Sequence, residues 1–421
     1  MDIASIANLT LEGVSTEIPK VLITDKSLAG QFKNTRATRV SNRLFRIVSQ
    51  IALAGGDSRN INLDGGALPL GSSPKWLAGG VTPTTISVAT NWTELTAMIG
   101  QKVDGVAIQN VVTEALANLT VMMRNWEDIG LHTDGTGSLA TLNGAPANKT
   151  VTLNPTPFGA RNIEIGQTVD IVNPVGNVTR GSLTIDNKSA YLGSAQSFTY
   201  VTPDVAGAAN NDIVRYGGLT DGVPKWINGL KYLVNTSTAG ELHGIARTTP
   251  QVVANGFDMG GSPITRSAIQ LLLSQRRARI SEEELGTSFW YTHDSQVQSL
   301  KEIGYDLQYI PLTGGEASKF DPFFRGEPTI EGQPIKRGQH ADQQAWYLLV
   351  PDCFGFVKFS DPFWAMVFGS RVYNTYNQGG TPNLQYGSCY INPKQVFLDN
   401  AVAQGLISGC GVPSGHINGL S

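Results

Sequence analysis

Five histidines and three cysteines are the side chains of this 421-residue chain best suited to proton transfer, nucleophilic attack or soft-metal binding. Two of the histidines have a carboxylate close by in the sequence, as His293-Asp294 and as His340-x-Asp342. Each pair could form a general base with a carboxylate that orients it. Adjacent polar residues at the start of a helix or in a hairpin are more often caps and turn formers. We therefore predict no catalytic residue.

Metal and cofactor sites are not indicated either. The run Glu282–Glu284 could gather a divalent cation, but such a run at the end of a helix is more often a solvated face. Asp134-Gly-Thr-Gly lacks the later acidic ligands of a calcium loop. Cys353, Cys389 and Cys410 are far apart and form no CxxC pair. With no phosphate-binding Gly-x-x-x-x-Gly-Lys and no Gly-x-Ser-x-Gly, we expect no metal, no cofactor and no enzyme.

Two groups of basic residues stand out from this background. One lies in the segment 27–56, which contains no Asp or Glu, and the other lies near the end of a predicted helix. Such groups contact phosphates, or they pair with an acidic patch on a neighbouring subunit, and both interpretations stay open. No aromatic platform accompanies either group, so we expect no base stacking on single strands. The candidate residues are Lys33, Arg36, Arg39, Arg43, Arg46, Arg276, Arg277 and Arg279.

The composition points to self-association. Only 15% of the residues are charged, against about 25% in an average protein, and 47 are glycine. A neutral polar surface suits a protein that covers itself with copies of itself. The net charge of -3 argues against a surface that coats nucleic acid throughout, although a local basic patch is compatible with it. The length predicts two or three domains.

Membrane and secretory segments are not expected. The longest apolar runs, such as residues 345–350, are far shorter than the roughly 18 residues that span a bilayer. The first basic residue is Lys20, and no signal-peptide pattern precedes it. We expect assembly and use in a cytoplasm, without a membrane partner.

The basic segment leads into a predicted long hairpin. Residues 43–50 read as a strand, residues 54–80 are rich in glycine, and residues 84–90 alternate as a second strand. A loop of this length is unusual in a compact domain and is normally functional or disordered. We predict that it reaches out to grip a neighbour.

A long helix follows the hairpin. Between residues 91 and 130 apolar side chains recur at steps of three and four residues, which predicts a helix of about 28 residues that ends near Gly130. The next residues, 131–137, form a turn-rich stretch in which two glycines are free to adopt positive φ.

The rest of the chain predicts an all-β module and then an α+β core. Short alternating runs between residues 149 and 216 read as strands at 150–153, 168–172, 182–185 and 197–201. A second helix is predicted with Ser262 as N-cap and Pro263 at its first position. After it come a strand at 288–292, a helix at 294–303 and a strand at 309–312.

This order of elements resembles the major capsid proteins of tailed bacteriophages. Three stretches carry the resemblance: Asn62–Pro69 in the hairpin, Leu131–Ala140 after the helix, and Ile330–Ile335. The resemblance implies the α+β fold named after phage Hong Kong 97, with a long spine helix, an extended hairpin loop and, in this chain, an inserted small all-β domain.

The resemblance also implies a division of the chain. The N-terminal arm would run along a neighbouring subunit, the extended loop would lie over the next one, and the axial domain would meet its copies at fivefold and sixfold axes. The expected parts are an arm at 1–40, the extended loop at 41–95, a peripheral domain with the spine helix at 96–145, the inserted β domain at 146–222, the axial domain at 223–325, and return strands with the C-terminus at 326–421.

The function that the resemblance implies is structural. The chain would be a capsid subunit that forms pentamers and hexamers in an icosahedral shell around double-stranded DNA, assembled in the host bacterial cytoplasm and located in the virion. DNA would be held by weak non-specific contact, and scaffolding, portal and cement proteins are possible partners. An encapsulin-like nanocompartment shell and, from a different class, a β-rich carbohydrate-active enzyme are the alternatives.

Overall fold

The structure is a computed structural model of the chain. It describes residues 28–32, 38–39, 45–52, 75–93, 111–189, 196–201, 205–222, 225–280, 287–307, 329–330, 333–366, 370, 372–376 and 382–412. Several predictions lie outside these residues. They are the positions of Lys33, Arg36 and Arg43, the stretch 62–69, the acidic run 282–284 and the strand at 309–312.

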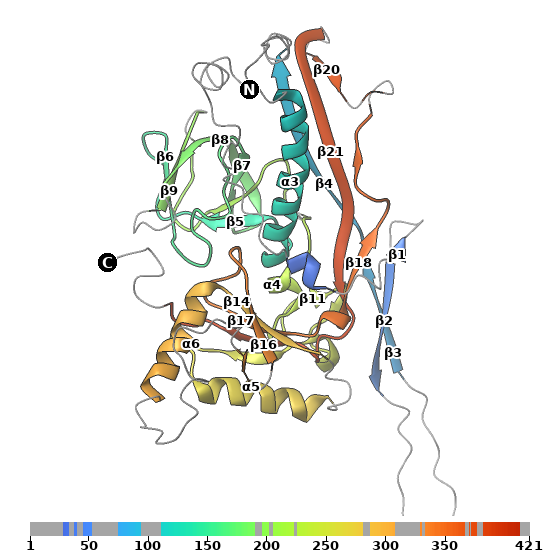
Figure 1. Cartoon of the computed structure of the whole chain (residues 1–421), viewed down its shortest axis with the longest axis vertical. Coiled ribbons are helices and arrows are strands. Elements are labelled where there is room, and N and C mark those ends of the chain that lie inside the picture. The colour runs from blue at the N-terminus through green and yellow to red at the C-terminus, as the bar shows by residue number, and fades with distance from the viewer. Residues whose placement is uncertain are drawn as a thin grey trace, which may run out of the picture.

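A six-stranded sheet runs along the long axis of the molecule (Figure 1) and is organised by one very long strand, β21 (Pro382–Leu398). One edge of β21 pairs antiparallel with β4 (Thr84–Thr93). Three further strands also pair antiparallel with β21, namely β18 (Phe354–Lys358), β19 (Phe363–Trp364) and β20 (Tyr373–Tyr376). The short N-terminal strand β1 (Thr38–Arg39) pairs in parallel with β18.

The long helix α3 (Val111–His132) packs on one face of this sheet. Ile86 and Val88, two residues apart on β4, are buried beneath it, as strand alternation requires. Glu127 of α3 accepts hydrogen bonds from Lys394 and Asn392 of β21. The predicted end of the helix near Gly130 is confirmed, and the turn after it has Gly135 and Gly137 at positive φ.

The predicted hairpin exists, but its second strand is a different segment. β2 (Phe45–Ala52) pairs antiparallel with β3 (Lys75–Val81), which lies inside the stretch expected to be loop. The alternating run 84–90 belongs instead to β4 and pairs with β21. Alternation shows which face of a strand is buried, but it does not identify the partner strand. Pro83 separates the two strands, because it cannot donate a ladder hydrogen bond.

The inserted module is a six-stranded antiparallel barrel. All four predicted strands are confirmed, and strands on either side of them complete the order β5-β10-β7-β8-β9-β6. Hydrogen bonds from Asn154 N–H to Thr141 O and from Asn143 N–H to Thr152 O, both 2.9 Å, join the last strand to the first, so the sheet closes. The strands are β5 (Ser138–Thr141), β6 (Thr150–Leu153), β7 (Thr168–Asn173), β8 (Val178–Lys188), β9 (Gln196–Tyr200) and β10 (Ile213–Tyr216).

A second mixed sheet, with α5 (Arg266–Arg279) and α6 (Asp294–Leu307), lies at the other end of the molecule. The predicted N-cap of α5 is wrong by three residues. Thr265 is the cap, and its Oγ1 accepts the Ala268 N–H at 3.1 Å. The backbone oxygen of Ser262 instead accepts the Gly411 N–H, and this hydrogen bond holds Ser262 in a turn. The strands, in sheet order, are β13 (Asn255–Asp258), β22 (Gly405–Ser408), β17 (Trp346–Leu349), β14 (Phe289–Thr292), β16 (Gln333–Arg337) and β15 (Thr329–Ile330).

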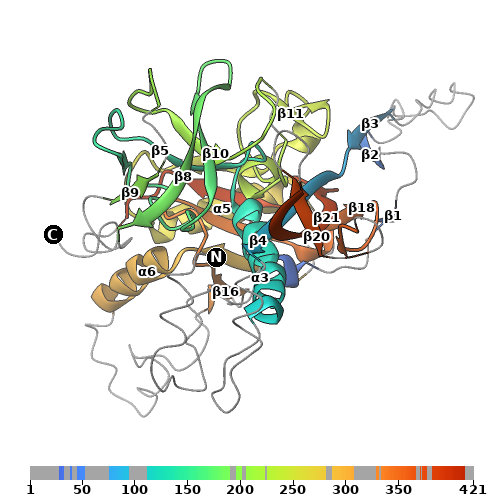
Figure 2. The ribbon, with the colours of Figure 1, turned by 90° about the horizontal axis from the view of Figure 1, so that it is seen from above.

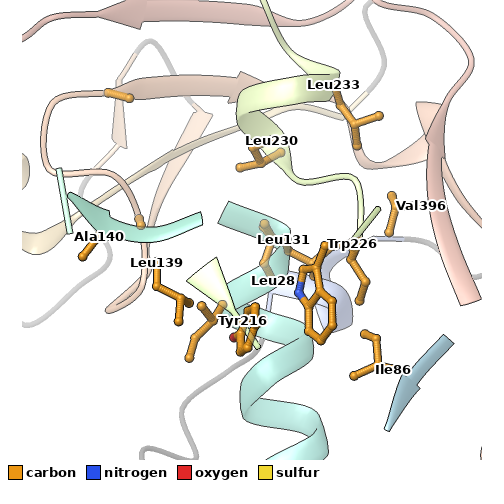
Figure 3. Packing of buried hydrophobic residues seen from close by; sticks show 14 of the residues in the cluster. Leu28, Ile86, Leu131, Leu139, Ala140, Tyr216, Trp226, Leu230, Leu233 and Val396 are labelled. Carbon is orange, nitrogen blue, oxygen red and sulfur yellow. The ribbon is translucent and has the colours of Figure 1, made fainter. Parts of the chain in front are cut away.

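One hydrophobic core joins the sheet, the spine helix and the barrel (Figure 3). Trp226 belongs to this core and stacks on Tyr216, with ring centroids 4.3 Å apart. Gly130 of α3 passes so close that an added Cβ would lie 2.9 Å from the Trp226 Nε1, which explains a glycine inside the helix. Short elements around this core are η1 (Leu28–Gln31), α4 (Leu230–Leu233), β11 (Glu241–Leu242), β12 (Ile245–Ala246), η3 (Pro250–Val252) and η6 (Pro351–Cys353). Among the helices in the described part of the chain, none is long and apolar enough to cross a membrane.

Candidate assembly surface

The hairpin of β2 and β3 is fixed to the body at its base. The Gly80 N–H donates a hydrogen bond of 2.7 Å to the backbone oxygen of His243, between β11 and β12. Phe45 packs against Phe397 of β21, with ring centroids 5.0 Å apart. Val81 is 2% exposed in the same small cluster. The base of the hairpin is therefore part of the folded subunit.

Beyond its base the hairpin stands clear of the body (Figures 1 and 2). The four residues 75–78 of β3 are all exposed, and Trp76 and Leu77 have 56% and 37% of their surface accessible. A two-stranded ribbon is marginally stable by itself, and exposed aromatic side chains of this size are typical of protein interfaces. This part of β3 is the clearest contact surface on the described chain.

The described residues of the N-terminal segment make contacts with the body of the subunit. Leu28 and Phe32 are buried in their own subunit, and the Leu28 N–H donates to Asp128 Oδ1 of α3 at 2.7 Å. Phe32 stacks on Phe354 of β18 with ring centroids 4.4 Å apart. Residues 28–32 therefore pack on the body of their own subunit, and β1 joins its long sheet. Two aromatic side chains in the segment 28–45 were the signal for this internal packing.

The N-terminal basic residues that the structure describes lie in two strands. Arg39 is directly opposite Lys358 in the parallel pair of β1 and β18. Arg46 is opposite Gly80 at the base of the hairpin. The structure thus places Arg39 in the long sheet and Arg46 in the hairpin, and it does not bring them into one ladder.

Arg276 does not belong to the predicted basic surface, so the prediction is wrong for this residue. Its side chain is buried, 1% exposed, and its Nη1 lies 3.4 Å from Ser288 Oγ. Burial lowers its pKa to about 10. The reason is helical phase: Ile269, Leu272 and Arg276 share the face that α5 turns to its sheet. That spacing was visible in the sequence.

The other two arginines of the predicted basic group, Arg277 and Arg279, are on the outer face of α5. Arg277 is exposed. Arg279 is also exposed, but its guanidinium donates to backbone and side-chain oxygens of the neighbouring segment, at 3.2 Å to Val253 O and 2.9 Å to Asn255 Oδ1. Its burial-lowered pKa agrees with this contact. Arg279 thus fixes the segment after η3, and Arg277 stays a candidate for contact with another molecule.

Sequence reasoning missed a buried polar junction between the spine helix, the barrel and the second sheet. His132 Nδ1 lies 2.7 Å from Asp128 O, and its Nε2 lies 2.6 Å from the Tyr291 hydroxyl of β14. A neutral imidazole satisfies both contacts by donating from Nδ1 and accepting at Nε2. His340 reaches the barrel, with Nδ1 2.9 Å from Asn162 Oδ1. Burial lowers the pKa of His132 to about 3 and that of His340 to about 4.

These histidines connect the spine helix, the barrel and the second sheet, and His340 does not form the pair with Asp342 that was considered from the sequence. His340 contacts two asparagine side chains, and Asp342 instead accepts the Gln344 N–H at 2.8 Å. His293 lies at the start of α6, where its Nδ1 accepts the Ser295 N–H at 3.1 Å. In the described part of the chain no three His, Cys, Asp or Glu side chains are grouped as a metal site would require.

Comparison with solved structures extends over nearly the whole chain. No protein-family model matches the sequence, and no curated protein matches it. A chain of the cyanophage A-1(L) capsid asymmetric unit superposes with a TM-score of 0.55 at 11% identity, over 97% of this chain and 99% of that chain. The capsid of a native GTA particle gives a TM-score of 0.51 at 9% identity, over 97% of this chain and 98% of that chain. The chain has the capsid-protein fold.

This capsid-protein fold confirms the predicted α+β class and its Hong Kong 97-like architecture. The strand pair expected near Ile330 is present, with Ile330 opposite Gln333 in β15 and β16. The long sheet, the spine helix and the projecting hairpin are thus the parts that the resemblance implied.

Proposed function

We propose that this chain is the major capsid subunit of a tailed bacteriophage, which assembles with copies of itself into the icosahedral shell around double-stranded DNA. The observation that carries the proposal is the projecting hairpin, anchored at Gly80 and exposing Trp76, on a chain with the capsid-protein fold. Exposed apolar side chains on a ribbon with no support of its own require a partner surface, and a second copy is always available in a shell.

The contact is heterologous in this proposal: the hairpin of one subunit lies over the long sheet of the next. Heterologous contacts close into rings, which gives pentamers and hexamers, and many modest contacts add up to a durable shell. The sheet and spine helix form the peripheral domain, the sheet with α5 and α6 forms the axial domain, and the barrel is an inserted domain. Scaffolding, portal and cement proteins, assembly in the bacterial cytoplasm and location in the virion are further parts of the proposal.

Electron microscopy of the expressed full-length chain tests the proposal. Shells or large rings are the expected result, and a protein that stays monomeric under every assembly condition would contradict it. The contents of native particles separate the alternatives, since DNA supports the phage capsid and protein cargo supports a nanocompartment. Reversing the charge of Arg36, Arg39, Arg43 and Arg46 together should block shells while the monomer stays folded.

A further inference from the structure

His340 connects three parts of the subunit through one imidazole ring. It lies in the loop after β16 of the second sheet and is 3% exposed. Its Nε2 lies 3.1 Å from Asn125 Oδ1 of α3, and its Nδ1 lies 2.9 Å from Asn162 Oδ1 of the barrel. Asn162 belongs to the connection between β6 and β7, residues 154–167. This connection is thus held to the body of the subunit by a side chain that can change its charge.

Both ring nitrogens of His340 face side-chain oxygens, and a neutral imidazole can donate to only one of them. The Asn125 amide is held in its orientation, because its Nδ2 donates to Glu164 Oε1 at 3.3 Å. The Asn162 amide can turn over, since its buried Nδ2 has no partner within the described part of the chain. The neutral ring therefore donates from Nε2 to Asn125 and accepts at Nδ1 from the turned amide of Asn162. The charged ring instead donates from both nitrogens and uses the Asn162 Oδ1.

A charged His340 ring is repelled by basic residues of the barrel. Burial, and after it the charges of Arg161 and Lys188, lower the pKa of His340 to about 4. Arg161 belongs to the same connection as Asn162, and its Nη2 donates to Ala341 O at 3.1 Å, beside His340 in the sequence. Glu164 lies 3.9 Å from Lys188 and offsets part of that charge.

The other titratable groups at this junction come from α3, the second sheet and the loop of His340 itself. His132 of α3 has its ring centroid 6.5 Å from that of His340, so two charged rings repel each other. Tyr291 of β14 is hydrogen-bonded to His132, and the Asp342 carboxylate accepts the Gln344 N–H at 2.8 Å. A proton on His340 therefore gains no carboxylate partner among these residues.

We propose that His340 and Asn162 form a proton-operated switch, which holds residues 154–167 against the body while the ring is neutral and releases them when it is protonated. The contact lies within one subunit, so the inference goes beyond the proposed function and does not depend on a shell. A released ring is solvated and ionises with the ordinary pKa near 6.5. The released state therefore binds more protons below pH 6.5, and the contact is lost progressively between about pH 6.5 and 4.

Hydrogen exchange of the full-length protein, read by mass spectrometry on peptides from residues 154–167, tests the inference. Phe158, Ala160 and Ile163 of this connection are buried, so the released state is a minor one, which hydrogen exchange detects. After correction for the intrinsic exchange rate, protection should fall about 60-fold between pH 7 and pH 4.5, since one group changes its pKa from about 4 to 6.5 on release.

Two variants of the switch should lose this fall. In His340→Gln the glutamine Nε2 can donate to Asn125 and its Oε1 can accept from Asn162, without titrating. In Asn162→Asp a carboxylate faces the ring and stabilises its charged form, so protection should rise from pH 7 to pH 4.5. His243→Gln is the matched control. It also removes a buried histidine, but that ring contacts β21 and Tyr232, so the fall should be unchanged.

Three results would overturn the inference. Protection of residues 154–167 that does not fall in acid would mean that the contact does not respond to protons. A fall of the same size in His340→Gln would assign the response to other groups. An equal fall in peptides of α5 would mean that acid opens the whole subunit and not this contact. Should His340→Gln fail to fold, the direction of the change in Asn162→Asp decides. Shell formation is scored separately by microscopy and does not enter this test.

Discussion

The backbone N–H of Gly80 donates a hydrogen bond of 2.7 Å to the backbone oxygen of His243. His243 is itself fixed, because its Nε2 accepts the Leu398 N–H at 3.1 Å and its own N–H donates to the Tyr232 hydroxyl at 2.9 Å. His243 thus connects the base of the hairpin to the end of β21. The direction in which the hairpin leaves the subunit depends on this connection.

Gly79→Ala should disturb that direction. An added Cβ would lie 2.7 Å from the His243 oxygen and 3.2 Å from the Ile245 side chain, so the hairpin must shift. We expect a folded monomer by circular dichroism and a loss of regular shells by electron microscopy. Ala78→Ser, at the exposed neighbouring position, is the control and should assemble normally. Regular shells from Gly79→Ala would show that the base tolerates displacement.

Trp76→Ala separates assembly from folding. Because the Trp76 side chain is 56% exposed, its truncation should change the free energy of unfolding by no more than about 0.5 kcal/mol. Loss of a large aromatic anchor should nevertheless raise the protein concentration needed for assembly, which light scattering measures. Val175→Ser, on the barrel at 79% exposure, should leave that concentration unchanged. An equal effect of both substitutions would argue against a special role for the hairpin.

Glu127→Gln tests the connection between the spine helix and the long strand. Glu127 and Lys394 are both largely buried, so removing the carboxylate leaves a buried ammonium without its counter-charge. We expect a loss of about 3–5 kcal/mol in the free energy of unfolding, measured with urea. The double variant Glu127→Gln, Lys394→Met should recover much of that loss. If the losses in the free energy of unfolding of the two single variants, Glu127→Gln and Lys394→Met, simply add in the double variant, the two side chains do not interact.

Stability should fall as the pH is lowered below neutrality. Burial lowers the pKa of His132 and that of His243 to about 3 each, against 6.5 for an exposed histidine. The unfolded chain therefore binds more protons below pH 6.5, and the stability present above that pH is lost progressively between about 6.5 and 3. At pH 4.5 each of these two histidines should lower the free energy of unfolding, measured with urea, by roughly 3 kcal/mol relative to neutral pH.

His243→Gln checks the assignment of this pH dependence. A glutamine Oε1 can accept the Leu398 N–H without titrating, so the variant should lose less stability than the wild type between pH 7 and pH 4.5. Parallel pH profiles for the variant and the wild type would assign the dependence to other groups.

The sequence predicted the parts of the fold that depend on local pattern. The barrel strands alternate between turns, and the spine helix has a clear 3.6-residue period, so both were found. The partner of β4 was not found, because β4 pairs with a strand about 300 residues later and nothing in residues 84–90 specifies that choice. The alignment of Arg39, Lys358 and Lys394 across β1, β18 and β21 could not be predicted for the same reason, since only strand register brings these residues opposite one another. Arg276 was recoverable, because it falls on the apolar stripe of α5.

The closure of the barrel has an evolutionary consequence. Leu142 at its incoming strand and Asp212 at its outgoing strand are hydrogen-bonded directly, at 2.8 Å from Leu142 N to Asp212 O. A short turn could span these two points, so a lineage could gain, lose or exchange everything between them without rerouting the rest of the chain. The contact between β5 and β6 also covers part of the two terminal strand edges of this sheet, and a covered edge is less available for pairing with another chain.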